Sequence, residues 1–325
     1  MQFQQSYTTV MILRQEGSLL EKRQLGRSDL FVSKMGLGCM SLGKEEAHAR
    51  SIIDEAVELG INYFDTADLY DFGLNEEFVG KALQNRRQDF IIATKAGNRW
   101  EEGKEGWTWD PSKAHIQKAV KDSLLRLGTD YIDLYQLHGG TIDDNIDETI
   151  EAFEELKKEG LIREYGISSI RPNVIKQYLE KSSIVSIMMQ YSLTDRRPEE
   201  WFPLIEEHGV SVIARGPLAK GILSERELDH AGSSIKEKGY MSYSFEELGE
   251  LREEMKKAAP RHSYTEAALQ YCLAAPAVAA VIPGASKLAQ LQQNTSAVNA
   301  EPLTKEEIEF LRKISKADRY EQHRE

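Results

Sequence analysis

The chain has 325 residues, which is enough for one large α/β domain or two domains of ordinary size. Its 41 Lys and Arg residues are outnumbered by 53 Asp and Glu residues, and the net charge of -12, with no basic cluster, argues against a nucleic-acid-binding protein. The two cysteines are too few for a disulfide framework and no apolar run approaches the length of a membrane span, so we expect a cytoplasmic protein that binds no membrane.

The N-terminal part of the chain has no regular pattern. Residues 1–20 show neither a helical nor a strand period, and the apolar run at 10–13 is too short for the core of a signal peptide. The run Gln15-Glu16-Gly17 can be encoded by a purine-rich ribosome-binding site, and Leu20 by a TTG start codon. We therefore expect residues 1–20 to be a disordered or wrongly assigned extension, and residues 21–325 to form one domain.

The first predicted element is a short β-hairpin, with strand-like segments at 23–25 and 31–33 around the turn at 26–29. From residue 35 onward, short apolar segments alternate with amphipathic helical patterns. Strands are expected at 35–38, 62–65, 90–94, 131–137, 162–168, 184–189, 210–214 and 278–282. The helices that follow them are expected at 52–59, 78–83, 116–127, 146–156, 174–179, 199–207, 265–273 and 288–298.

Eight strand–helix pairs in unbroken order predict a single (β/α)8 barrel, the TIM barrel, with the N-terminal hairpin as an addition. A doubly wound parallel sheet is the alternative, but the number of units and the lack of a G-x-G-x-x-G turn argue against it. The pattern at 301–314 predicts an extra C-terminal helix, followed by a charged tail at 316–325. The connections at 96–112 and 216–262 are too long for simple turns and should shape a site.

Four polar side chains are predicted to meet at one face of this barrel. Asp65, Lys95 and His138 each lie at or near the C-terminal end of a predicted strand, and Tyr70 follows Asp65 in the next loop. The C-terminal strand ends of a parallel barrel converge on the face where its chemistry takes place. Taken singly, Asp65 and Lys95 could be an ordinary ion pair. His138 could be a hydrogen-bonded polar group of the core, and Tyr70 an aromatic residue of a loop that covers the site. Together they suit proton transfer to a carbonyl oxygen.

Over residues 21–315 the chain resembles the aldo-keto reductase family. The matching stretches are 35–38, 62–67 with Tyr70, 94–95, 131–138, 160–168, 216–221 and 282–286. The resemblance implies an NADPH-dependent oxidoreductase that reduces aldehydes or ketones to alcohols, with a small-molecule carbonyl compound as its partner. It also implies that the four catalytic residues are Asp65, Tyr70, Lys95 and His138.

The resemblance gives each of these four residues a role. Tyr70 would act as general acid and protonate the substrate oxygen as the hydride arrives from the nicotinamide. A free phenol has a pKa of about 10, which the ammonium of Lys95 would lower, while Asp65 would keep the lysine charged and oriented. His138 would hydrogen-bond the carbonyl oxygen and fix its direction.

The resemblance assigns the nicotinamide end of the cofactor to Gly38, Cys39, Met40, Asp65, Ser168, Ser169, Gln190 and Tyr191. The ring of Tyr191 is expected to stack on the nicotinamide. Two positions depart from the family pattern: Ser169 replaces an asparagine, and Met188 stands where the family has a glutamine. Residues two apart face the same side of a strand, so Gln190 is taken as the substitute.

The rest of the cofactor is assigned in the same way. The pyrophosphate would meet Arg215, Gly216, Pro217, Leu218, Ala219, Lys220 and Gly221. The adenosine end would meet Gly284, Ala285, Ser286, Lys287, Gln290, Gln293 and Asn294. Ser286 and Lys287 suit a 2′-phosphate and favour NADPH (NADP+) over NADH, whereas Gln290 stands where many relatives have an arginine, which weakens that preference.

Two other functions are weighed against a reductase. A cofactor-binding barrel could serve as a regulatory subunit or redox sensor with little turnover, but the complete set of four catalytic residues argues against it. A lyase or phosphosugar enzyme would need a Schiff-base lysine or metal ligands, and no His, Asp or Glu set at such spacing accompanies Lys95. The loop tryptophans Trp100, Trp107 and Trp109 fit an aromatic-tolerant pocket and ordinary packing equally well, so the substrate is left open.

Overall fold

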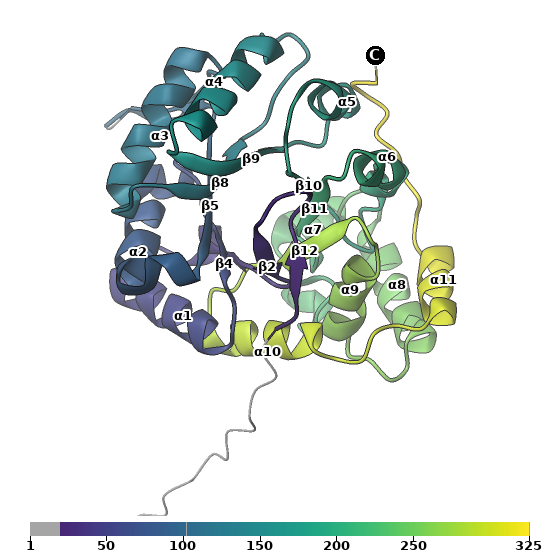
Figure 1. Ribbon diagram of the computed structural model, residues 1–325. Coiled ribbons are helices and arrows are strands. Elements are labelled where there is room, and N and C mark those ends of the chain that lie inside the picture. The colour runs from purple at the N-terminus through teal and green to yellow at the C-terminus, as the bar shows by residue number, and fades with distance from the viewer. Residues whose placement is uncertain (1–19, 102, 325) are drawn as a thin grey trace, which may run out of the picture.

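The computed structural model describes residues 20–101 and 103–324 (Figure 1). Residues 1–19 of the expected extension at 1–20 lie outside the described residues, whereas Leu20 packs into the core and so does not belong to a disordered segment. At the centre is an eight-stranded parallel sheet. Its strands are β3 (Leu37–Gly38), β4 (Tyr63–Asp65), β5 (Ile91–Ala96), β8 (Ile132–Leu137), β9 (Ile162–Ser168), β10 (Ser186–Gln190), β11 (Ser211–Arg215) and β12 (Val278–Ile282).

This sheet closes into a barrel. Each strand pairs with the next one in chain order from β3 to β12. Parallel bridges join Met35 to Val281 and Gly38 to Gly284, so the first strand segment meets the last. The amide of Gly36 donates to the Val281 oxygen at 2.9 Å and strengthens this seam. The prediction of a (β/α)8 barrel is therefore confirmed.

The helices that follow the strands form the outer layer of the molecule (Figure 1). They are α1 (Glu46–Glu58), α2 (Leu74–Leu83), α3 (Lys113–Leu127), α4 (Ile146–Lys158), α5 (Pro172–Lys181), α6 (Phe202–Glu207), α9 (Tyr264–Leu273) and α10 (Leu288–Val298). Each carries an apolar stripe that packs against the outer face of the strands. Their starts are marked by polar caps such as Ser112, Asn145 and the capping box of Ser263 with Glu266.

The N-terminal hairpin closes one end of the barrel, and in Figure 1 it lies across the centre of the ring of strands. It consists of β1 (Lys22–Gln24) and β2 (Phe31–Ser33), as predicted. Arg23 donates to the Val278 oxygen at 2.9 Å, and Gly26 donates to Ser211 at 2.8 Å. Because Val278 and Ser211 begin their strands, the hairpin covers the N-terminal end of the barrel and leaves the C-terminal end for the site.

The two long connections contain regular structure that the sequence analysis missed. The first carries a two-stranded antiparallel ribbon of β6 (Asn98–Arg99) and β7 (Thr108–Trp109). The second carries α7 (Ser233–Lys238) and α8 (Phe245–Ala258), and α8 begins at a capping box of Ser244 with Glu247. That capping box, followed by an apolar stripe, was the available signal for α8.

The C-terminal region also differs from the prediction. Helix α11 (Lys305–Ile314) begins after 301, because Thr304 forms a capping box with Glu307. The tail after it is charged, but it packs on the barrel and runs from α11 past α6 to α5 (Figure 1). Tyr320 is buried, the amide of Asn173 donates to the oxygen of His323 at 2.7 Å, and Arg324 pairs with Glu200 at 2.8 Å.

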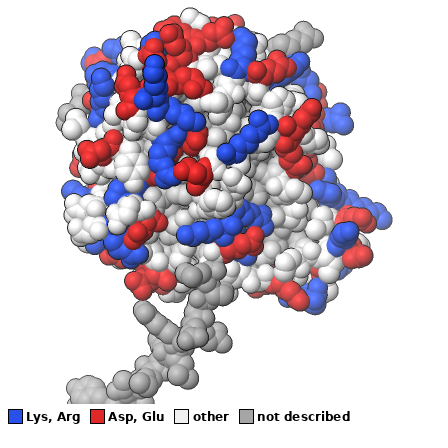
Figure 2. Space-filling model, viewed as in Figure 1, with Lys and Arg blue, Asp and Glu red and all other residues white. Residues whose placement is uncertain are grey.

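The surface mixes both signs of charge. On the face shown in Figure 2, Lys and Arg side chains lie among Asp and Glu side chains. Exposed pairs such as Arg50 with Asp54 at 2.8 Å and Lys81 with Glu46 at 2.9 Å follow the same pattern. Within the residues that the structure describes, no helix combines the length and the apolar character that a membrane span requires.

Gly80 sets how closely α2 approaches α3, and this contact yields a prediction. A Cβ atom at Gly80 would lie 2.3 Å from the backbone oxygen of Leu127. Because the obstacle is backbone and not a flexible side chain, Gly80→Ala should lower the free energy of unfolding by about 1–3 kcal/mol, as overpacking does. Urea denaturation measures this directly.

Gly232 supplies the matched control. It has a φ of -61°, and a Cβ atom there would meet nothing within 4 Å. Gly232 is the N-cap of α7, where alanine is less favourable than glycine, so Gly232→Ala should lower the free energy of unfolding by less than about 1 kcal/mol and by less than Gly80→Ala. Equal effects of the two substitutions would contradict the packing explanation.

Candidate active site

Three of the predicted catalytic residues reach the barrel mouth because of strand periodicity. Tyr63, Ala93 and Leu134 belong to the apolar cluster inside the barrel. The side chains two residues further along each strand, Asp65, Lys95 and Gln136, therefore point inward at the C-terminal strand ends. The β5–β8 register places Lys95 directly beside Gln136, and His138 follows at the end of β8.

Lys95 is the centre of the hydrogen-bond network. Its side chain is fully buried, and its Nζ atom donates to Oδ1 of Asp65 and to the backbone oxygen of Thr66, each at 2.7 Å. The same Nζ atom lies 3.4 Å from the hydroxyl oxygen of Tyr70. Gln136 donates to the other carboxylate oxygen of Asp65 at 3.3 Å. One ammonium therefore links the acid to the phenol.

The electrostatics of this pair follow from burial and close contact. Burial opposes a charged lysine, but the Asp65 carboxylate, with Tyr70, raises the pKa of Lys95 above its usual value. Burial raises the pKa of Asp65, and the ammonium of Lys95 acts against that effect. Lys95 thus stays protonated over the physiological range and holds a positive charge beside the Tyr70 oxygen.

A tight turn brings Tyr70 back toward Lys95. The turn, η2 (Tyr70–Gly73), contains Asp71 at a φ of 47° and Phe72 at a φ of 52°. Non-glycine residues in the left-handed region cost on the order of 1–2 kcal/mol each, and such strain tends to collect at functional sites. The ion pair of Asp71 with Lys44 at 3.5 Å helps to hold the turn.

His138 completes the group. Its ring stands edge-on to the ring of Tyr70, with centroids 5.9 Å apart. Burial, then the charges of Lys95 and Arg215, lower the pKa of His138 to about 3. Its Nδ1 atom is buried and has no hydrogen-bond partner among the described residues. The imidazole is therefore neutral at physiological pH, and a neutral imidazole has one nitrogen that donates a hydrogen bond and one that accepts.

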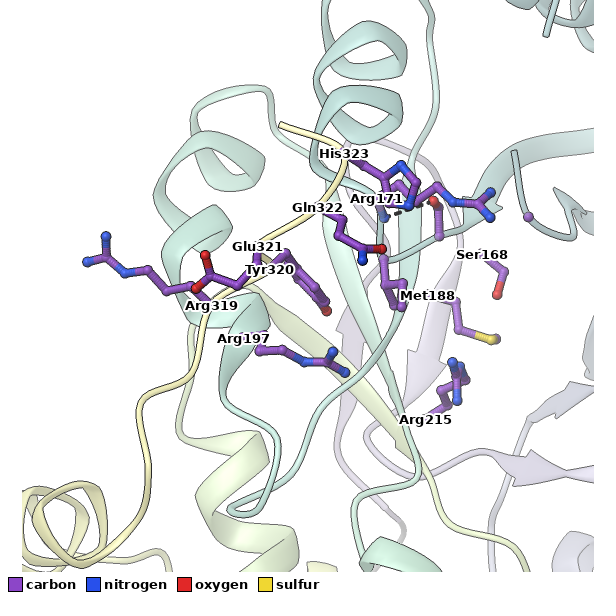
Figure 3. A pocket seen from close by; sticks show the side chains of 13 residues that line it. Ser168, Arg171, Met188, Arg197, Arg215, Arg319, Tyr320, Glu321, Gln322 and His323 are labelled. Carbon is purple, nitrogen blue, oxygen red and sulfur yellow. Dashed lines mark hydrogen bonds between the residues drawn. The ribbon is translucent and has the colours of Figure 1, made fainter. Parts of the chain in front are cut away.

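A cavity of about 540 Å³ opens where β8 to β11 end (Figure 3). Gly139, Ser168, Met188 and Arg215 line its inner wall. Its outer wall comes from the C-terminal tail, residues 319–323. None of the four predicted catalytic side chains lines this cavity, but Gly139 directly follows His138 in the chain, and the cavity has the size that small-molecule sites have.

The residues assigned to the pyrophosphate form a tight turn after β11. Gly216, Ala219, Lys220 and Gly221 all have positive φ values. A Cβ atom at Gly216 would meet only the Gln190 side chain, at 3.8 Å, so the backbone there is open to a close approach. Lys220 is exposed, which places a cation at the turn. A negatively charged group fits these residues.

The residues assigned to the adenosine end surround the start of α10. Asn294 is buried there, and its Nδ2 donor has no partner among the described residues, which fits a ligand acceptor. Ser286 donates from its amide and its hydroxyl to Oε1 of Gln290, at 3.0 and 3.2 Å. A phosphate at Ser286 would therefore replace the Gln290 contact. Gln293 donates to Glu225.

Tyr191 requires a correction. It follows Met188 and Gln190 on the opposite face of the strand, so its ring enters the layer between strands and helices. The ring is fully buried, packs against Phe202 and donates to Glu199 at 3.0 Å. An enclosed ring has no free face, so the expectation that it stacks on a nicotinamide is wrong.

Other nicotinamide-end residues vary in accessibility. The Cys39 side chain is buried, where burial raises the pKa of its thiol, so only its backbone can face a ligand. Met40 is 67% exposed. Ser169 accepts from the amide of Arg171 at 3.2 Å. Gln190 lies between Arg215 and Asp195, so its amide is already hydrogen-bonded.

Sequence reasoning missed several supporting residues. Gln136 precedes His138 by two positions, so strand periodicity alone was the signal for it. Asn75 accepts from Thr66 at 2.6 Å and donates to the Cys39 oxygen at 2.8 Å, which ties β4 to the loop after β3. The tail residue Tyr320 carried no sequence signal, because its place depends on contacts with distant parts of the chain.

The family model, the similar proteins and the similar solved structures all point to one family. The model for the Aldo/keto reductase family matches residues 34–316. The uncharacterized oxidoreductase YqkF of Bacillus subtilis is 68% identical and covers 94% of this chain and 100% of its own. The NADH-specific methylglyoxal reductase of Escherichia coli is 30% identical, over 86% and 94% of the two chains. The holo form of aldo-keto reductase AKR11C1 from Bacillus halodurans superimposes with a TM-score of 0.90 at 65% identity, covering 94% and 100%.

The lowered pKa of His138 yields a prediction about stability. The folded protein keeps this imidazole neutral down to about pH 3, whereas in the unfolded chain it takes up a proton near pH 6.5. The stabilising contribution is therefore complete above the unfolded value and is lost as the pH falls toward 3. Between pH 7 and pH 5 the wild type should lose about 2 kcal/mol more than His138→Gln.

Urea unfolding of both proteins at the two pH values measures this difference. Parallel pH dependences would show that His138 titrates normally in the folded protein, against the burial that the structure shows.

Proposed function

This chain belongs to the aldo-keto reductase family of NAD(P)H-dependent oxidoreductases, and we propose that it reduces aldehydes or ketones to alcohols with NADPH. The observation that carries the proposal is the buried Lys95 ammonium between the Asp65 carboxylate and the Tyr70 hydroxyl. A bound nicotinamide would supply the hydride. The chain itself would supply a proton, an orientation for the carbonyl group and a shielded cavity.

Tyr70 is the proposed proton donor. When a carbonyl carbon accepts a hydride, its oxygen gains negative charge and needs a proton. Giving up the phenolic proton leaves negative charge on the Tyr70 oxygen, and the Lys95 ammonium at 3.4 Å stabilises that charge. Asp65 and Thr66 hold the ammonium in place from the other side. In the reverse reaction the same tyrosine would take the proton from the alcohol.

His138 is the proposed orienting residue. As a neutral imidazole edge-on to Tyr70, it can donate a hydrogen bond to the substrate oxygen without competing as an acid. A carbonyl oxygen that accepts hydrogen bonds from both the Tyr70 hydroxyl and the His138 ring is held in the orientation that proton transfer from Tyr70 requires. Orientation of this kind lowers the barrier because it is established before the reaction begins.

The cofactor is proposed to lie across the mouth from β9 to α10. Arg215 and Lys220 at the turn after β11 suit the pyrophosphate, and Asn294 suits the adenosine end. Ser286 and Lys287 stand at the start of α10, where backbone amides and an ammonium favour a phosphate, so we favour NADPH over NADH. The Escherichia coli relative named as NADH-specific shows that this choice needs its own experiment.

We place the reaction in the cytoplasm. Cys39 and Cys272 are buried thiols that form no disulfide, as in proteins of a reducing compartment. The proposed partner is a small carbonyl compound, in keeping with the size of the cavity.

Tyr70→Phe tests the proton donor. The substitution keeps the ring and removes the hydroxyl, so cofactor binding should persist while kcat falls by about 10²–10⁴-fold, the usual contribution of general acid catalysis. Steady-state kinetics with the best aldehyde of a panel measure the loss. A near wild-type kcat would contradict the role of Tyr70.

Lys287→Ala tests the preference for NADPH. Ligands that bind only the folded state raise its melting temperature. The substitution should reduce the NADPH-induced shift more than the NADH-induced shift, because only NADPH carries the 2′-phosphate. Lys22→Ala, an exposed lysine in the hairpin at the other end of the barrel, serves as the control and should change neither shift. A larger wild-type shift with NADH would reverse the assignment.

A further inference from the structure

The cavity where β8 to β11 end has a positively charged lining. Four arginines line it, Arg171, Arg197, Arg215 and Arg319, against one carboxylate, Glu321. The chain as a whole carries a net charge of -12, so this excess of positive charge is local. A cavity with such a lining attracts anions even on a negatively charged protein.

The four arginines differ in how their charge is compensated. Arg197 donates two hydrogen bonds of 2.7 Å to the Asp195 carboxylate, which neutralises it. The side chain of Arg319 points away from the cavity (Figure 3). Among the described residues, Arg171 and Arg215 have no carboxylate partner: Arg215 donates to the neutral amide of Gln190 at 3.0 Å, and Arg171 donates to the backbone oxygen of Gly140.

Arg171 and Arg215 stand at different walls. Arg215 directly precedes the turn at 216–221, which the proposed function assigns to the pyrophosphate of the cofactor. Arg171 follows β9 and contacts the loop that begins at His138. Two residues of extended chain span at most about 7 Å, so the α-carbon of Gly140 lies within about 7 Å of the α-carbon of His138. Arg171 is thus a cation without a carboxylate partner among the described residues, and it contacts the loop that follows His138.

The tail adds a second unsatisfied group. Tyr320 is 5% exposed, its side chain points into the cavity, and its hydroxyl has no hydrogen-bond partner among the described residues (Figure 3). The Arg197 guanidinium lies 4.7 Å from the centre of its ring. A buried hydroxyl without a partner is rare in proteins, and an ordered water or a polar ligand atom would satisfy it.

We propose that this enzyme reduces carbonyl compounds that carry a carboxylate a few carbons from the carbonyl group, and that Arg171 binds the carboxylate. A guanidinium offers a planar pair of donors that matches the two carboxylate oxygens. The carbonyl oxygen lies at Tyr70 and His138, and the polar far end of the cavity, with Tyr320, accommodates larger oxygen-rich acids. The proposal rests on the proposed reductase function and specifies its substrate class.

A pair of substrates that differ only in charge tests the proposal. Purified wild type and Arg171→Met are assayed with 4-oxobutanoate and with its methyl ester, and 5-oxopentanoate with its ester extends the chain length. The wild type should prefer the acid. A hydrogen bond to a charged group raises binding affinity by a factor of about 10–100. Arg171→Met should therefore lower the acid-to-ester ratio of kcat/KM by about the same factor. The change should appear mainly in KM, because the carboxylate is bound equally before and during the reaction.

Two further variants separate charge from structure. Arg171→Lys keeps the cation and loses the planar fork, so it should retain part of the preference for the acid. Arg319→Met removes an arginine whose side chain points away from the cavity, and it should leave the acid-to-ester ratio unchanged. An unchanged ratio in Arg171→Met, or an equal effect of Arg319→Met, would overturn the assignment.

The wild-type assay distinguishes this proposal from the reductase function itself. If both esters are reduced and the acids are not preferred, the Arg171 proposal fails and the reductase function stands, whether or not Arg171→Met folds. If neither the acids, the esters nor simple neutral aldehydes are reduced with NADPH or NADH, the proposed function fails and the substrate class fails with it.

Discussion

A lysine ammonium and an aspartate carboxylate lie 2.7 Å apart in a part of the barrel that solvent does not reach. Removing two such charges from water carries a penalty of several kcal/mol for each ion, and a well-packed apolar pair of the same size is often as stable. The pair is better understood through what it positions, because Lys95 also reaches the Tyr70 hydroxyl and the Thr66 oxygen. β4, β5 and β8 must keep their register for these contacts to form.

The same constraint organises the rest of the mouth. Burial, and then the charges of Lys95 and Arg215, keep the pKa of His138 low, so a second cation does not form beside the buried ammonium. The guanidinium groups of Arg171 and Arg215 line the cavity and are each held by a hydrogen bond, to Gly140 and Gln190. Under the proposed function, the neutral His138 and the Tyr70 hydroxyl would meet the carbonyl oxygen, and the arginines of the cavity would meet anionic parts of the ligands.

The sequence predicted what depends on short-range order. The eight strands, the hairpin and the location of Asp65 and Lys95 at C-terminal strand ends follow from short apolar runs and the turns after them, and the structure confirms these positions. Tyr191 was misplaced although the two-residue period of a strand places it opposite to Gln190. The docked tail with Tyr320 and the Arg171 contact with Gly140 join segments far apart in the chain, and no local pattern encodes such contacts.

The central claim is that Asp65 acts on the reaction through Lys95. The most direct measurement is the single-turnover rate constant of hydride transfer for Asp65→Asn, Lys95→Met and the double variant, compared as a double-mutant cycle. If Asp65 serves to hold the ammonium, each single variant slows the reaction strongly and the double variant is no slower than Lys95→Met alone. Rate losses that multiply in the double variant would contradict this account and give Asp65 an independent part in the chemistry.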